Sequence, residues 1–135
     1  MTRPHSVPLF WCLLFWVPSL LAQTPAFSES PVFVSGQDGY NTYRIPAIAR
    51  TTNGTLLAFC EGRKTSSSDA GDIDVVLRRS TNNGASWEPM QVVTEEGTNA
   101  AITIGNPAPV VDETTGHIFL LFCRNNSRVA ASPGP

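Results

Sequence analysis

Short apolar runs alternate with polar turn sequences along the chain from about residue 35 to residue 124. Runs of this length, bounded by Gly, Asn and Thr, are typical of β-strands. No stretch has the periodicity of an amphipathic helix. The pattern therefore predicts an all-β chain. The strands are expected at residues 45–50, 55–60, 73–79, 88–93, 108–111 and 117–123.

One sequence phrase occurs twice. PAIARTTNG at residues 46–54 precedes LLAFC at 56–60, and PAPVVDETTG at 107–116 precedes IFLLFC at 118–123. A repeat of about 60 residues that is built of short strands is typical of β-propeller blades. The first copy predicts a four-stranded unit and the second copy only two strands. We therefore expect about one and a half blades.

The first 22 residues differ from the rest of the chain. Arg3 and His5 precede an apolar stretch at residues 7–22, which Pro8 and Pro18 interrupt. A membrane span needs roughly 20 apolar residues, so the stretch predicts a secretory signal peptide, cleaved after Ala22. An uncleaved N-terminal anchor is the alternative. Residues 23–135 would then form a secreted product without stable membrane insertion.

Export agrees with two possible glycosylation sites, at Asn53 and Asn125. It would leave two cysteines, Cys60 and Cys123, which could pair in an oxidising compartment. Both cysteines end apolar runs, which favours buried free thiols over a disulfide.

Composition limits the possible partners and cofactors. Charged residues make up 15% of the chain and its formal net charge is -2, so no basic surface for nucleic acid is expected. His117 has no second ligand at a metal-binding spacing, and no glycine-rich phosphate loop occurs. We expect no metal and no cofactor.

Two motifs stand out against this background. YRIP at residues 43–46 places Arg44 at the start of an apolar strand, and STNNGASW at residues 80–87 follows it. In the second motif, Gly84 permits a positive φ, polar side chains can bond to the turn, and Trp87 can pack against it. An arginine at a strand end can form an ordinary surface ion pair, or it can bind an anion through its fork of donors.

Together, the motifs resemble those of the sialidase (neuraminidase) family, whose sequences carry F/Y-R-I-P followed by S-x-D-x-G-x-T-W, the "Asp box". Asn82 stands where the family has Asp, although an Asn oxygen can accept the same bonds. The resemblance covers residues 35–124. It implies a six-bladed β-propeller of four-stranded antiparallel blades, of which this chain would be an N-terminal fragment.

The resemblance also implies site residues. Arg44 would be one of three arginines that bind the substrate carboxylate, and Arg63 would support that site and the nearby acid. Asp69, on a loop rich in Ser and Gly, would be the general acid and base. Asn106, at the start of the next blade, would border the pocket for the N-acyl group.

Alternatives to these assignments remain open. Asp72 and Asp74 are rivals of Asp69, although Asp74 alternates with apolar residues and is expected to face solvent or a neighbouring strand. Asn106 could be a turn residue. Glu61 and Lys64 are expected to be solvated neighbours of Arg63.

The implied function is that of an exo-alpha-sialidase, which hydrolyses terminal sialic acid from glycoconjugates with retention of configuration. Such enzymes use a tyrosine nucleophile, and neither that tyrosine nor its activating glutamate can be mapped here. The chain by itself is therefore expected to be inactive. The alternatives are a non-catalytic Asp-box propeller or sialic-acid-binding module, and an inert truncation product.

Overall fold

The computed structural model describes residues 27–96 and 102–126, which form six β-strands and no helix. The all-β prediction is therefore confirmed. The strands are β1 (Thr42–Arg50), β2 (Leu56–Arg63), β3 (Ile73–Ser80), β4 (Gln91–Thr94), β5 (Ile102–Val111) and β6 (Ile118–Asn126). The predicted signal peptide at residues 1–22 lies outside the described residues.

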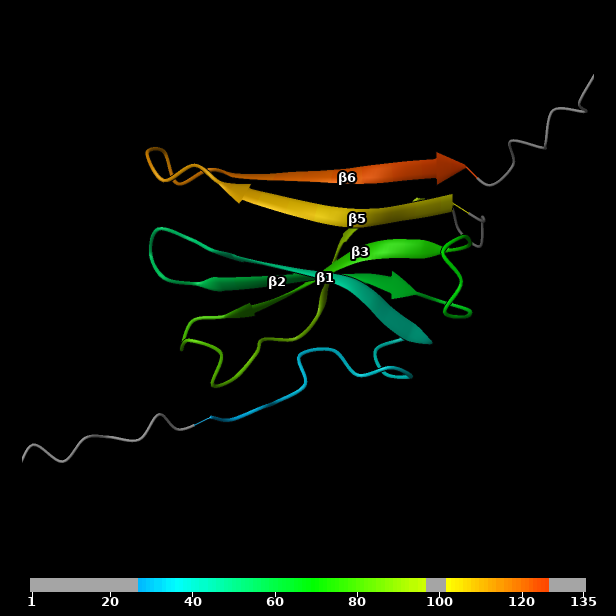
Figure 1. Cartoon of the computed structure of the whole chain (residues 1–135), viewed down its shortest axis with the longest axis horizontal. Coiled ribbons are helices and arrows are strands. Elements are labelled where there is room, and N and C mark those ends of the chain that lie inside the picture. The colour runs from blue at the N-terminus through cyan, green and yellow to red at the C-terminus, as the bar shows by residue number, and fades with distance from the viewer. Residues whose placement is uncertain (1–26, 97–101, 127–135) are drawn as a thin grey trace, which may run out of the picture.

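The strands fall into a four-stranded unit and a hairpin. β1, β2, β3 and β4 pair antiparallel, each with its neighbour in the sequence. β5 joins β3 through one parallel pairing, Ile73 with Thr103, and β6 then pairs antiparallel with β5. Figure 1 shows the β5–β6 hairpin beside the first unit. This arrangement matches the internal repeat, with four strands in the first copy and two in the second.

β1 and β5 begin earlier in the chain than the sequence pattern predicted. Pro46 and Pro107 lie inside these strands, where register shifts occur between Arg44 and Ala47 and between Gly105 and Ala108. A proline has no N–H for the ladder and is tolerated in a strand at a bulge. Each strand thus continues through its proline, and β1 begins at Thr42 and β5 at Ile102.

β2 is buried on both faces. On one face, Leu57 and Phe59 pack with Val75 and Ile104, so this cluster joins the four-stranded unit to β5. On the other face, Cys60 packs with two further buried residues, Tyr40 and Val76. Burial on both faces explains why β2 has a continuous apolar run instead of an alternating pattern.

The turn after β3 is held by its own side chains. Ser80 Oγ accepts a hydrogen bond from the Gly84 amide at 2.9 Å, and Asn82 Oδ1 accepts one from the Ser86 amide at 2.9 Å. Asn82 Nδ2 donates to Ser86 Oγ at 2.8 Å. Asn83 and Gly84 have positive φ values, 57° and 85°. The chain can therefore reverse between β3 and β4 with its polar groups satisfied.

Cys60 and Cys123 are both free thiols, the first buried and the second exposed. Cys123 is not a buried thiol as expected, because among the described strands β6 pairs only with β5. None of the described residues forms a helix of the length and apolarity that a membrane span requires.

Candidate active site

The bulge in β1 sets the position of Arg44. Ile45, the next residue, has φ 54°, a conformation that costs energy for a β-branched side chain. The Cys60 thiol lies opposite and donates to the Arg44 carbonyl at 3.0 Å. This contact satisfies a carbonyl beside the register shift and holds the backbone from which Arg44 projects.

The Arg44 side chain is 46% exposed and reaches the loop between β2 and β3. Its Nη1 lies 3.0 Å from Asp69 Oδ1 and 3.4 Å from the Ser67 carbonyl oxygen. An exposed guanidinium that is held from its backbone keeps donors available for a planar anion. The geometry therefore suits the binding of another carboxylate, provided that this carboxylate replaces Asp69 on Arg44.

Arg63 contacts the same loop from the end of β2, but its side chain is only 3% exposed. Its Nη1 lies 2.8 Å from Asp69 Oδ1 and donates to the Ser67 carbonyl at 2.5 Å. Its Nε and Nη2 donate to Glu61 Oε2 at 3.0 and 2.6 Å. Burial acts to lower the pKa of Arg63, but its bonds to Glu61 and Asp69 outweigh burial and raise that pKa above its ordinary value.

Asp69 thus lies between the two arginines, while its side chain is 81% exposed. Hydroxyl groups hold the loop around it: Ser66 Oγ accepts from the Ser68 amide, and Ser68 Oγ accepts from the Ala70 amide. The next strand pair restrains the loop, because Thr103 Oγ1 accepts from the Gly71 amide at 3.2 Å. The structure therefore brings together Arg44, Arg63 and Asp69, the three residues that the family resemblance placed at one site.

Asp72 and Asp74 lie in a different cluster, with Lys64. Of the two expected orientations of Asp74, toward solvent or toward a neighbouring strand, the structure excludes the first: Asp74 is buried and accepts a hydrogen bond from the Tyr40 hydroxyl at 2.6 Å. Lys64 Nζ lies 3.2 Å from Asp74 Oδ2 and 3.4 Å from Asp72 Oδ1. Burial and the Asp74 carboxylate raise the pKa of Tyr40. Both rival aspartates and Lys64 are thus engaged in ion pairs away from the arginines.

Glu61 does not lie in solvent beside Arg63, where the sequence predicted it. It is buried rather than solvated, and its Oε1 accepts from the Asn106 amide at 2.8 Å. Asn106 itself lies within β5, not at its start, and has φ 54° with an exposed side chain. A signal was present, because residues two apart in a strand share a face and Glu61 is two before Arg63.

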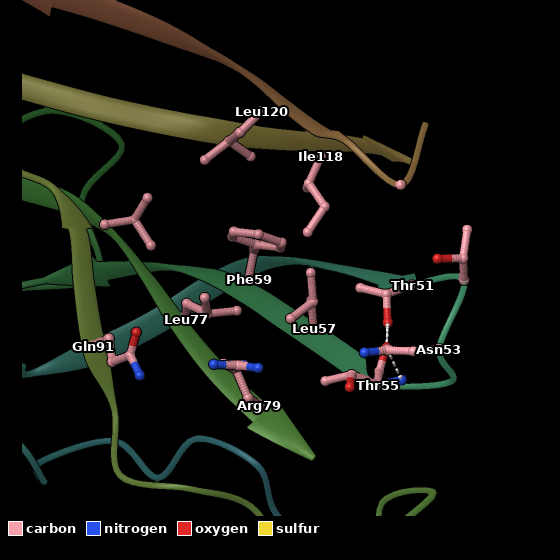
Figure 2. A pocket seen from close by; sticks show the side chains of 13 residues that line it. Thr51, Asn53, Thr55, Leu57, Phe59, Leu77, Arg79, Gln91, Ile118 and Leu120 are labelled. Atoms are coloured by element: carbon pink, nitrogen blue, oxygen red, sulfur yellow. Dashed lines mark hydrogen bonds between the residues drawn. The ribbon is translucent and has the colours of Figure 1, made fainter. Parts of the chain in front are cut away.

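A groove formed by other described residues lies elsewhere. Figure 2 shows it between the first unit and the β5–β6 hairpin, beside the turn after β1. Apolar side chains line much of it, among them Leu57, Phe59, Ile118 and Leu120. Leu57 and Phe59 belong to β2, where Leu57 lies near the end opposite Arg63, and Ile118 and Leu120 belong to β6. Arg79 is the one charged residue among the described residues that line this groove, so the groove offers an anion a single guanidinium instead of the arginine pair. No group of three or more metal-ligating side chains occurs among the described residues.

Comparison with known proteins assigns this arrangement to a family. The chain is 47% identical over 98 residues to an exo-alpha-sialidase of Aspergillus fumigatus, a match that covers 67% of this chain and 23% of the relative. It is 40% identical over 96 residues to a sialidase of Micromonospora viridifaciens, covering 70% of this chain and 15% of the relative. No family model matches the chain.

A solved structure agrees with these relatives. The Hadza microbial sialidase Hz136 superposes with a TM-score of 0.60 at 36% identity, over 64% of this chain and 18% of that chain. The strand arrangement is thus that of a sialidase β-propeller, and the chain belongs to the sialidase family. It spans less than a quarter of the length of these relatives.

Proposed function

We propose that this chain supplies part of the sialic-acid site of an exo-alpha-sialidase, a retaining glycoside hydrolase that acts on sialylated glycoconjugates. The observation that carries the proposal is Asp69 held between Arg44 and Arg63. In this position the Asp69 carboxylate stands where a substrate carboxylate would meet Arg44. Relatives that are named exo-alpha-sialidase and sialidase supply the reaction class.

In the proposed mechanism, a sialic acid carboxylate replaces Asp69 on Arg44. The guanidinium fork then binds the carboxylate through two donors and orients the sugar. Asp69, released from Arg44 and still beside Arg63, turns toward the glycosidic oxygen. There, after taking up a proton from solvent, it protonates the leaving group and later takes a proton from the attacking water. An exposed side chain on a Ser-rich loop suits this movement.

Further parts of the proposal rest on the family resemblance. The complete fold is a six-bladed propeller, the turn at residues 80–87 is an Asp box, and Asn106 borders the N-acyl pocket. The exposed Asn106 side chain supports a contact with substrate. The apolar stretch at residues 7–22, and not the resemblance, supports a signal peptide at residues 1–22, which would make the product, residues 23–135 of this chain, extracellular.

The test is a titration of the chain with N-acetylneuraminic acid, followed through the ¹⁵N-labelled arginine side chains. We expect the Arg44 signal to shift, and the Arg44→Ala variant to lose binding. Arg50→Ala is the matched control, because Arg50 is an exposed arginine at the other end of β1. The methyl ester of the sugar, which lacks the charge, should bind at least ~10-fold more weakly. Equal binding of acid and ester would refute the carboxylate role.

A further inference from the structure

Glu61 is a buried carboxylate whose two oxygens accept hydrogen bonds from residues of two strands, β2 and β5. Oε2 accepts both donors on one edge of the Arg63 guanidinium, and Oε1 accepts the Asn106 amide of β5. A buried charge needs a partner and satisfied lone pairs. Glu61 has both, and they come from residues that are far apart in the sequence.

This pairing determines what Arg63 presents to the site. With Nε and Nη2 turned to Glu61, the remaining nitrogen, Nη1, faces the loop and contacts Asp69 and Ser67. A guanidinium is planar, so fixing one edge fixes the direction of the other nitrogen. The orientation of Arg63 toward Asp69 thus depends on Glu61.

The bulge of β5 provides the other half of the link. At Gly105 a Cβ would collide with Glu61 Oε1, so glycine lets β5 pass close to the carboxylate. The next residue, Asn106, falls within the register shift and has φ 54°, which leaves its N–H to Glu61. The close approach at Gly105 and the bulge at Asn106 therefore both serve the same contact of β5 with the Glu61 carboxylate.

We propose that Glu61 is a positioning residue that orients Arg63 toward Asp69 and couples this orientation to the β5 bulge at Gly105 and Asn106. The inference deepens the proposed function and rests on it for the role of Asp69. The physical link itself does not depend on a substrate, so it can be tested without one.

The test follows two N–H groups of the ¹⁵N-labelled full chain, the Arg63 Nε–H and the Asn106 amide. In Glu61→Gln, we expect both to exchange with solvent at least ~10-fold faster, because each loses a bond to a charged acceptor. The Gly84 amide, held by Ser80, should keep its exchange rate and so report an intact fold. Glu96→Gln is the matched control, since it removes a carboxylate that pairs with an arginine, Arg124, at the surface.

A second variant tests the coupling if Glu61→Gln fails to fold. Gly105→Ala leaves both charged side chains in place but pushes Glu61 from the Asn106 amide. We expect the Arg63 Nε–H signal to move in this variant, in step with faster exchange at Asn106. An unchanged Arg63 signal in Gly105→Ala, or in a folded Glu61→Gln, would overturn the proposal. If the wild-type chain fails to bind sialic acid while both N–H groups are protected, that result would instead count against the proposed function.

Discussion

Ile45 in β1 and Asn106 in β5 have the same left-handed backbone conformation, φ 54° in each, and each precedes a proline. Both lie in register shifts of their strand pairs. Left-handed φ is unfavourable for a non-glycine residue, above all for a β-branched one, and persists where surrounding structure stabilises it. The internal repeat therefore encodes a bulge as well as strands. In the first copy the bulge displays Arg44, and in the second it gives an amide to Glu61.

Arg44→Ala in the active protein should lower kcat/KM for sialosides at least ~10-fold, because a charge-assisted contact to the substrate carboxylate is lost. Arg44→Lys should recover only part of this loss, since an ammonium keeps the charge without the bidentate fork. Steady-state kinetics with a sialyl-lactose substrate provides the measurement. Wild-type rates in Arg44→Ala would contradict the proposal that Arg44 binds the substrate carboxylate.

Asp69→Asn should affect substrates according to their leaving groups. Natural glycosides leave poorly without protonation, so their hydrolysis should slow by ~100-fold or more, whereas aryl glycosides need little protonation and should slow less. The comparison is of kcat for the two substrate types. Equal losses on both would shift the acid role to Asp72 or Asp74, although both of these pair with Lys64.

Asn82→Ala should destabilise the chain by about 1–2 kcal/mol, because the Ser86 amide and the hydroxyls of Ser80 and Ser86 lose their partner. Asn82→Asp is the matched variant and should cost less than about 0.5 kcal/mol, since it keeps the accepting oxygen. Urea unfolding at low protein concentration measures both. Equal destabilisation by the two substitutions would contradict this account of the turn.

Stability should fall in alkaline solution because of Cys60. Burial raises the pKa of its thiol from 9.0 to about 11, so the unfolded chain releases this proton first as the pH rises. The stabilisation is complete below about pH 9 and is lost as the pH approaches 11, by up to about 3 kcal/mol. Urea midpoints at about pH 8 and pH 11 measure the fall.

In Cys60→Ala this alkaline fall should shrink, although the raised pKa of Tyr40 contributes a part that remains. The variant is less stable at neutral pH, so the comparison is the pH-dependent change and not the absolute midpoint. A fall of the same size in wild type and variant would exclude the thiol as its source.

β6 should make the isolated chain self-associate. Phe119 and Leu121 are 56% and 60% exposed, and among the described strands β6 pairs only with β5. A free apolar strand edge is a template for pairing with another chain. Sedimentation velocity should show association that increases with concentration, and Leu121→Lys should reduce it. A monomer that melts sharply and reversibly would refute this prediction.

The sequence by itself determined the local features of this protein. Alternation of apolar runs and turn residues predicted the six strands, and the repeat predicted a four-stranded unit followed by a hairpin. The turn at residues 80–87 is likewise held within eight neighbouring positions. Arg44 stood out through the YRIP motif, whereas Arg63 and Asp69 were expected at the site from the family resemblance. The proximity of Arg63 and Asp69 was predictable because they are six residues apart, whereas Arg44 lies beside them because β1 pairs with β2.

Only the tertiary structure decided how Glu61 and Asp74 are used. Glu61 was expected to be solvated beyond the strand at residues 55–60, and Asp74 was expected within a strand. Each is buried against a partner more than thirty residues away in the sequence, Asn106 and Tyr40 respectively. The positions of the bulges were also hidden, because a proline marks a strand start as readily as an interruption. Local pattern gives the direction in which a side chain points, whereas its burial depends on which distant strand packs over it.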